Sequence, residues 1–414
     1  MKKKKTQNEQ RLKHLPFFEV LAEAPEGSDA AKLATAGLLA LRMIDHWVLA
    51  GRAIVEPESV SVRSVRGAIM ALPPSEPVRE ALLTTVNTMQ LLRLPDLVPV
   101  LPRVYAYGQI LERHHGQMRL AADVYDSVVR LADAEYDTEL VLNGYTRLAF
   151  CQRKAGALDD AEASSRALVK LAQKRGNRTF AIWGKMGVAQ VAMLRGDLAL
   201  ADSQMEAIAA EAQQYDLTPQ LAAALHNRSV VAYHARNHVR ASVLAHRALK
   251  LTTDLVERDR VLGDLAAYLT ASGEYAAALD AFRILEATAS SEELRVGAIG
   301  NILITAARMQ DRQLFDATMA RLSLSRLSAS ARLSLQVEVA AGFRRFGEPD
   351  EADRWLREAR DTAARFELPA DLAHESRAQP VVHSVVERAS DSVESDATLE
   401  VAADLRQLAA TLCG

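Results

Sequence analysis

The sequence predicts an all-α protein, a solenoid of stacked helix pairs, and two observations support this prediction. The first is a recurring signature in which a turn residue is followed five positions later by alanine. The pairs are Gly116 and Ala121, Gly156 and Ala161, Gly196 and Ala201, Arg236 and Ala241, Gly273 and Ala278, and Gly347 and Ala352. The second is composition, because 49% of the residues are hydrophobic but only 5% are aromatic, and much of the apolar share is alanine. Alanine is the best helix former and lets helices approach closely.

The spacing of the signature is regular, with steps of forty residues between 116 and 236 and of thirty-seven between 236 and 347. Gln310 and Phe315 occupy the one position in this series where both signature residues are replaced. Glycine tolerates a positive φ and can therefore end the first helix of a pair. The alanine lies where the second helix crosses the first, and a larger side chain there would push the two helices apart.

The segment from Leu262 to Phe282 resembles the tetratricopeptide repeat family. Leu262, Leu265, Ala266 and Leu269 precede Gly273, and Ala278 and Phe282 follow it at the family's spacing. The resemblance covers about residues 100–366 and implies a right-handed α-solenoid of about seven helix pairs. These units are longer than the common one and resemble helix-pair solenoids of bacterial signalling and regulatory proteins. HEAT and armadillo arrays have an overlapping period and stay as the alternative, although the glycine–alanine signature argues against them.

The sequence predicts that the chain has four parts, the repeats and three flanking regions. Residues 1–15 are expected to be a disordered basic tail, since Lys2, Lys3, Lys4 and Lys5 open it. Residues 16–99 predict a helical N-terminal region or cap, either a divergent pair or a separate module. Residues 100–366 hold the repeats. Residues 367–414 are expected to form an acidic linker and a terminal capping helix that closes the array.

Charge and cysteine content limit the functional classes. The net charge of −3 gives no overall attraction to nucleic acid or to an anionic membrane. Two cysteines make no disulfide framework, which fits a reducing compartment. The most apolar stretch, residues 30–50, is interrupted by charged residues and does not predict a membrane span. We therefore expect a cytoplasmic protein without a membrane partner.

Motifs of catalysis are missing from the sequence, which contains no phosphate loop, no His-Glu-x-x-His helix and no nucleophile elbow. His234 and His238 flank a turn without a cysteine partner, so zinc is not expected. The helix expected at 61–72 offers only Arg63 and Arg66, which is too few polar groups for reading DNA bases. We expect no enzyme, no cofactor, no metal and no nucleic-acid partner.

In the family that the sequence resembles, the first helix of each pair lines a concave groove. The row six residues before each turn would form the groove floor; its candidates are Ile110, Phe150, Gln190, Val230 and Ile304. The row three and two residues before the turn would form the groove rim; its candidates are Arg113, His114, Arg153, Lys154, Tyr233, His234, Arg308, Arg344 and Arg345. Basic residues also favour helix C-termini for the sake of the helix dipole, and this explanation stays open beside the functional one.

An apolar floor with a basic rim suits a protein or peptide partner, and best an acidic amphipathic one. The sequence therefore predicts a binding scaffold or adaptor that uses the groove of a tetratricopeptide-like solenoid. The alternative is a ligand-responsive regulatory subunit, as in signal transduction or transcription regulation, in which an occupant of the groove changes the pitch of the solenoid.

Overall fold

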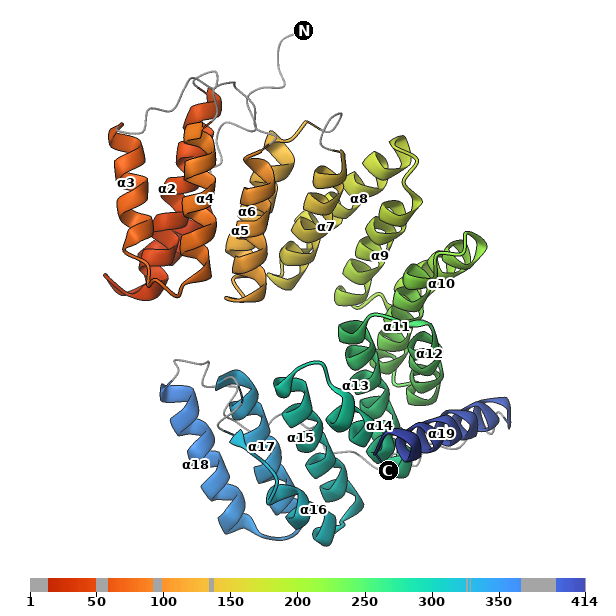
Figure 1. Ribbon diagram of the computed structural model, residues 1–414. Coiled ribbons are helices and arrows are strands. Elements are labelled where there is room, and N and C mark those ends of the chain that lie inside the picture. Colours follow the sequence, from red (N-terminus) through yellow and green to blue (C-terminus); the bar gives the residue numbers. More distant parts are fainter. Residues whose placement is uncertain are drawn as a thin grey trace. The chain divides into compact units, whose positions relative to one another are not determined.

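The computed structural model describes residues 14–49, 59–91, 99–133, 138–324, 327, 329–365 and 392–413. Within these residues the regular elements are nineteen α-helices. The chain divides into two compact units, residues 1–195 and 196–414. Successive helices of each unit lie side by side in a stack (Figure 1). This confirms the predicted fold class, an all-α solenoid of tetratricopeptide-like helix pairs.

The described residues of the first unit form nine helices. They are α1 (Leu15–Glu23), α2 (Asp29–Leu49), α3 (Val60–Met70), α4 (Pro77–Leu91), α5 (Leu101–Arg113), α6 (Met118–Leu131), α7 (Thr138–Lys154), α8 (Leu158–Lys174) and α9 (Arg178–Leu194). Helices α1 to α4, from the region 16–99, share one hydrophobic cluster with α5, α6 and α7. Phe17, Trp47, Val65, Met89 and Leu111 are buried in this cluster.

Ten helices are formed by the part of the second unit that the structure describes. They are α10 (Leu198–Gln214), α11 (Thr218–His234), α12 (His238–Leu251), α13 (Leu255–Ser272), α14 (Tyr275–Thr288), α15 (Glu292–Met309), α16 (Arg312–Met319), α17 (Ala329–Arg345), α18 (Pro349–Arg365) and α19 (Ser392–Cys413).

All seven turn positions of the signature adopt a positive φ. They are Gly116 (63°), Gly156 (81°), Gly196 (87°), Arg236 (64°), Gly273 (86°), Gln310 (57°) and Gly347 (79°). After most of these turns the next backbone N–H donates to the carbonyl five residues earlier, as from Asn237 to Ala232 at 2.9 Å and from Asp311 to Ala306 at 2.9 Å. This is the Schellman arrangement that satisfies the free carbonyls at a helix end. The turns at Arg236 and Gln310 therefore keep the geometry that glycine supplies elsewhere.

The residues five positions after the turns are all buried. Ala121, Ala201, Ala241, Ala278 and Ala352 are 0% exposed, Ala161 is 1% exposed, and Phe315 in the divergent position is 1% exposed. Ala276, on the same helix as Ala278, is exposed. The repeat register that the sequence predicts is thus confirmed.

The boundary predicted for the N-terminal tail is wrong at its last two residues. Residues 1–13 lie outside the described residues, but His14 is only 2% exposed and Leu15 begins α1. The His14 ring meets Asp123 of α6 through Nδ1 at 2.5 Å and Asp45 of α2 through Nε2 at 3.2 Å. Two carboxylates from neighbouring helices thus hold a residue that the charge pattern alone assigned to a solvated tail.

The sequence predicts that the C-terminal helix caps the end of the array, but the structure places this helix elsewhere. Helix α19 packs against α14 and α12 (Figure 1). Val401 and Leu405 are each 1% exposed, and Ala409 is 8% exposed, in the same cluster as Leu244 and Phe282. The acidic linker predicted before this helix falls on residues 366–391, outside the described residues.

No helix among the described residues combines the length and the apolar character that crossing a membrane requires.

Candidate functional site

The predicted floor and rim residues fall on the first helices of the pairs or directly at their ends. In the first unit, Ile110 lies on α5, Phe150 on α7 and Gln190 on α9, and all three are half-buried. Arg113, His114 and Lys154 are exposed, whereas Arg153 is half-buried. In this unit the floor candidates are thus half-buried, and the rim candidates are exposed except for Arg153.

Phe150 is the centre of a basic cluster on α7. The guanidinium carbon of Arg147 lies 4.7 Å from the centroid of its ring, that of Arg153 lies 5.4 Å away, and the Lys154 ammonium lies 5.9 Å away. Cations within about 6 Å of an aromatic ring are attracted to its face. We call Arg147, Phe150, Arg153 and Lys154 the Phe150 cluster.

A buried carboxylate fixes one member of the Phe150 cluster. Glu112 of α5 is 6% exposed and accepts hydrogen bonds from the Nε of Arg147 at 2.9 Å and from the Tyr125 hydroxyl at 3.0 Å. A second guanidinium nitrogen of Arg147 also contacts Glu112. The Arg147 guanidinium is therefore held beside the Phe150 ring, with less side-chain freedom than a solvated arginine has.

Positive charge also reaches the neighbouring Tyr105, whose ring lies 5.3 Å from that of Tyr125. Burial raises the pKa of Tyr105, while Arg147 and Arg113 both act to lower it. Burial likewise raises the pKa of the Cys151 thiol to about 12, and Arg147 opposes that shift. Both groups are therefore neutral at physiological pH, and the Cys151 thiol is buried.

In the second unit, the first helices α11 and α13 bring aromatic groups together. Tyr233 of α11 stacks on Tyr268 of α13, with ring centroids 4.9 Å apart and an interplanar angle of 30°. His238 lies 5.2 Å from Tyr233 on the other side of the turn, and His234 lies 6.1 Å away. Burial first, and then Arg236, lowers the pKa of His238. This histidine is consequently neutral at pH 7.

The remaining rim candidates of the second unit are less available to an acidic ligand than the basic residues around Phe150. Arg308 of α15 is half-buried, while Arg344 and Arg345 at the end of α17 are exposed. Arg344 forms an ion pair with Asp353 of α18 at 3.2 Å, so its charge is partly compensated. Val230 of α11 and Ile304 of α15, the floor candidates, are half-buried. The structure thus brings basic and aromatic groups together most closely at the Phe150 cluster.

Residues that the sequence analysis missed complete this cluster. Arg147 lies three residues before Phe150, a spacing that places both on one helical stripe, and this signal was available from the sequence. Glu112, Tyr105 and Tyr125 depend on the packing of α5 and α6 beside α7, which the helical pattern does not fix. In the second unit Tyr268 was missed because it lies five residues before its turn, between the two rows.

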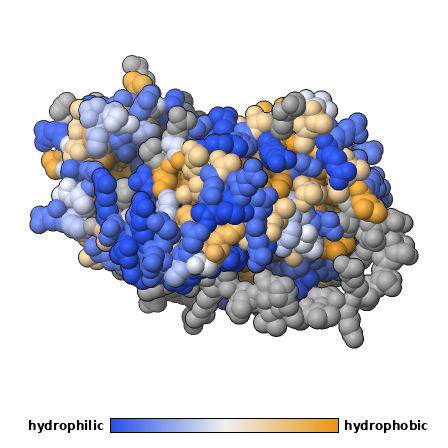
Figure 2. Space-filling view, turned by 90° about the horizontal axis from the view of Figure 1, so that it is seen from below, coloured by the Kyte–Doolittle hydropathy of each residue, from blue (hydrophilic) through white to orange (hydrophobic). Residues whose placement is uncertain are grey.

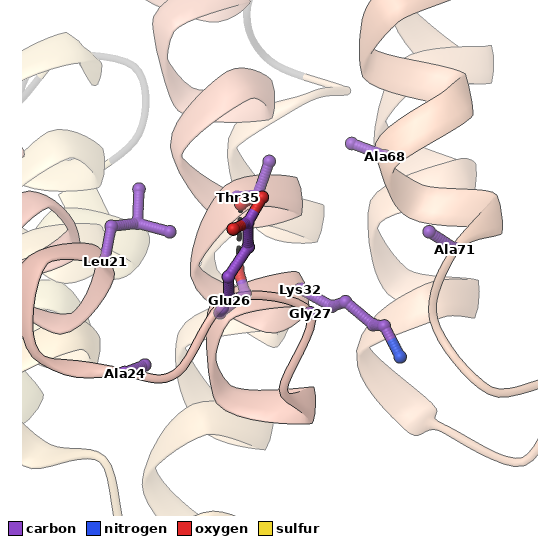
Figure 3. Close-up of a pocket in the computed structure, with 9 residues that line it drawn as sticks. Leu21, Ala24, Glu26, Gly27, Lys32, Thr35, Ala68 and Ala71 are labelled. Carbon is purple, nitrogen blue, oxygen red and sulfur yellow. Dashed lines mark hydrogen bonds between the residues drawn. The ribbon is translucent and has the colours of Figure 1, made fainter.

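Two cavities are distinct from these surfaces. One, of about 310 Å³, lies between α1, α2 and α3 (Figure 3). Small residues line it, among them Ala24, Ala68 and Ala71, while Lys32 pairs with Asp29 at 3.5 Å. The other cavity, of about 450 Å³, lies beside α19 and is described below. In the part of the chain that the structure describes, no group of three metal-ligating side chains converges.

The surface of the molecule is mixed in character. On the face that Figure 2 shows, hydrophobic patches alternate with hydrophilic residues. Leu194 at the end of α9 is 48% exposed, and Leu255 and Val256 at the start of α13 are 60% and 62% exposed.

Comparisons with known proteins concern the fold alone. No protein-family model matches the sequence, and no curated protein matches it. A Rap protein complexed with Competence and Sporulation Factor is similar in structure, with a TM-score of 0.47 and 12% identity over 83% of this chain and 99% of that chain. The apo form of RapI has a TM-score of 0.47 and 12% identity, over 86% of this chain and 99% of its own. BtubC (BKLC) from P. vanneervenii has a TM-score of 0.35 and 16% identity, over 56% of this chain and 88% of its own. All three likenesses are to helical proteins at low identity.

Proposed function

We propose that this protein is a scaffold that binds an acidic peptide or protein segment at the Phe150 cluster of α7 and the adjoining end of α5. The observation that supports this proposal is the ring of Phe150 with three cationic groups within 6 Å of its centroid. Three fixed charges around one half-buried ring offer both attraction for carboxylates and an apolar surface for a side chain.

The charge balance of the cluster favours an anionic partner. Glu112 compensates Arg147, and Arg113 at the end of α5 adds an exposed positive charge. Arginine donates paired hydrogen bonds to carboxylates, which gives such a surface orientation as well as attraction. Exposed charges of this kind mainly accelerate association and make it sensitive to salt.

The aromatic ring supplies the second part of the binding energy. Burying one large apolar side chain contributes roughly 1.5–3 kcal/mol, which lengthens the life of a complex. An aromatic or aliphatic side chain of the ligand beside Phe150, flanked by carboxylates for Arg153 and Lys154, would use both properties. The preferred ligand is therefore a segment in which acidic and large apolar residues alternate.

A selection from a random peptide library, displayed on phage and panned against the immobilised full-length protein, tests this proposal. Enrichment of acidic sequences that contain an aromatic or large aliphatic residue is the expected outcome. The same selection on Arg153→Glu with Lys154→Glu should lose that enrichment. A matched control is Lys170→Glu with Lys174→Glu on α8, which reverses two charges on the second helix of the same pair. Enrichment of the same acidic sequences by the Phe150-cluster variant would contradict the proposal.

A further inference from the structure

Helix α19 is an acidic amphipathic helix bound to the second helices of two repeats, α12 and α14. Its apolar side buries Val401 and Leu405, with Ala409 one turn further along. Its acidic side meets basic residues of α12. Asp404 lies 2.7 Å from the Lys250 ammonium and 3.2 Å from Nε2 of His246, and Glu400 lies 3.3 Å from the same ammonium.

The fit of α19 to this surface is incomplete. A cavity of about 450 Å³ remains between α19, the end of α12 and α13. Leu249, Leu262, Leu405 and Leu408 form its apolar lining, and the polar and charged lining residues are His246, Lys250, Arg258, Asp404, Gln407 and Thr411. Because this cavity is open beside Leu262 and Leu405, α19 makes fewer contacts there than a helix with bulkier side chains would.

The charges in this cavity are unequally matched. Asp404 compensates Lys250 and also contacts His246, whose pKa is lowered by burial and by Lys250, but no carboxylate among the described residues pairs with the half-buried Arg258. Residues 400, 404, 407 and 411 share one helical stripe, because they are spaced by four, three and four. The stripe is acidic at Glu400 and Asp404 and neutral at Gln407 and Thr411, which line the same cavity as Arg258. The surface therefore has a basic group beyond the last acidic residue of α19.

We propose that the α12–α14 surface is a docking site for an acidic amphipathic helix of a partner protein, and that α19 occupies it within the chain as a weaker competitor. The partner helix would carry carboxylates at the positions of Glu400 and Asp404. It would carry a further carboxylate at the position of Gln407 or Thr411, where Arg258 can meet it. A larger apolar side chain toward Leu249 and Leu262 would fill the cavity. This site lies on α12, α13 and α14 of the second unit and is independent of the Phe150 cluster.

The first test strengthens α19 within the full-length chain. Gln407→Glu adds the missing carboxylate with almost no change in size, and an added ion pair at a partly exposed site should slow hydrogen exchange of the α19 amides by about three-fold. Arg258→Gln should abolish this gain. Arg260→Gln is the matched control, since it removes an exposed arginine of α13 that pairs with Glu257. A gain that survives Arg258→Gln, or no gain at all, would overturn the proposal.

The second test supplies the helix from outside. A fluorescent peptide of residues 392–413 carrying Gln407→Glu is titrated into full-length Leu405→Asp, in which α19 no longer buries its central leucine. Binding should be at least about ten-fold tighter than to the wild-type chain, where α19 competes, and about three-fold weaker when Arg258→Gln is added. Circular dichroism shows whether Leu405→Asp is folded. If it is not, Asp404→Lys replaces it, because this change removes the contacts of α19 with Lys250 and His246 and keeps the buried leucine.

Other occupants would give different results. We call the variant used in the second test, Leu405→Asp or Asp404→Lys, the undocked variant. If sodium decanoate raises the melting temperature of the wild-type chain but the peptide does not bind the undocked variant, the cavity is a site for small anions and the proposal fails. If the undocked variant forms a dimer in analytical ultracentrifugation and the peptide does not dissociate it, the surface belongs to a second copy. Neither result affects binding at the Phe150 cluster, which uses different helices.

Discussion

The ring of Phe315 lies against the α-carbon of Gly342, so that a β-carbon at residue 342 would approach Cε2 of Phe315 to 2.7 Å. Phe315 occupies the position that alanine fills in the other repeats, and its ring also packs edge-on against Phe343 at 5.2 Å. The large residue is accommodated because the neighbouring helix α17 has no side chain at the point of contact. In the divergent repeat, the large side chain of Phe315 is thus accommodated by the absence of a side chain at Gly342.

This contact predicts that the effect of Gly342→Ala on the free energy of unfolding changes sign when Phe315 is replaced by alanine. Gly342→Ala alone should destabilise the second unit by about 1–3 kcal/mol, because the new methyl group meets the Phe315 ring. Phe315→Ala alone should cost about 3–5 kcal/mol through the cavity it leaves. In the Phe315→Ala background, Gly342→Ala should instead stabilise by up to about 1 kcal/mol, since alanine is the better helix former. Urea unfolding of the four proteins measures the cycle, and additive effects would show that the two residues are not coupled.

The repeat register gives a second prediction, on α14. Ala278 is 0% exposed at the helix crossing, whereas Ala276 is exposed on the same helix. Ala278→Phe should lower the free energy of unfolding by about 2–3 kcal/mol, since overpacking at a crossing cannot relax freely. Ala276→Phe should change it by less than about 0.5 kcal/mol. Thermal and urea denaturation of both variants compare the positions, and equal losses would contradict the register.

A third prediction concerns pH and His14. Burial alone would lower the pKa of this histidine, but hydrogen bonds and charge from Asp123 and Asp45 raise it to about 9 from an ordinary value of 6.5. Because the pKa is raised in the folded state, the stabilisation is fully present below pH 6.5 and is lost as the pH rises through 9. The first unit should therefore lose about 2–3 kcal/mol between pH 6.5 and 9.5.

The measurement is urea unfolding of the wild type and of His14→Asn at several values of pH. Asparagine tolerates the positive φ of residue 14, which is 65°, and does not titrate. The pH dependence between 6.5 and 9.5 should flatten in this variant. A slope as steep as that of the wild type would assign the effect to other groups.

For the Phe150 cluster we predict that different residues control the association rate and the dissociation rate of the bound peptide. With a peptide obtained by display, Arg153→Glu with Lys154→Glu should slow association and flatten its dependence on salt, because exposed charges steer the encounter. Phe150→Ala should leave association nearly unchanged and speed dissociation about ten-fold or more. Surface plasmon resonance at two salt concentrations measures both rates. If both variants stay folded and bind the peptide as the wild type does, the ligand binds elsewhere.

The parts of the fold that the sequence could predict are those fixed by neighbours in the chain. A turn at Arg236 or Gln310 follows from spacing alone, although neither residue is glycine, because the adjoining helices impose the same geometry. Burial of the alanines five residues later follows for the same reason. The floor and rim rows lie on first helices because the spacing before each turn fixes the helix on which they fall.

What the sequence could not predict depends on contacts between distant segments. His14 and Asp123 are 109 residues apart, and a basic N-terminal segment gives no sign that two carboxylates will surround its last residue. Arg147 and Glu112 are 35 residues apart and meet only because α7 packs beside α5. Helical periodicity identifies which side of α19 is apolar, but it does not select α12 and α14 among the many helices that this side could cover.

The docking of α19 also has a consequence for the order of folding. Most contacts of a solenoid join neighbouring segments, whereas Lys250 and Glu400 are separated by 150 residues. At ribosomal rates of about 5–20 residues per second, Thr288, the last residue of α14, is synthesised roughly 6–22 seconds before Glu400. Helix pairs form far faster than that. During every round of translation the α12–α14 surface is therefore folded but uncovered, and a partner helix present at that time would meet it before α19 exists.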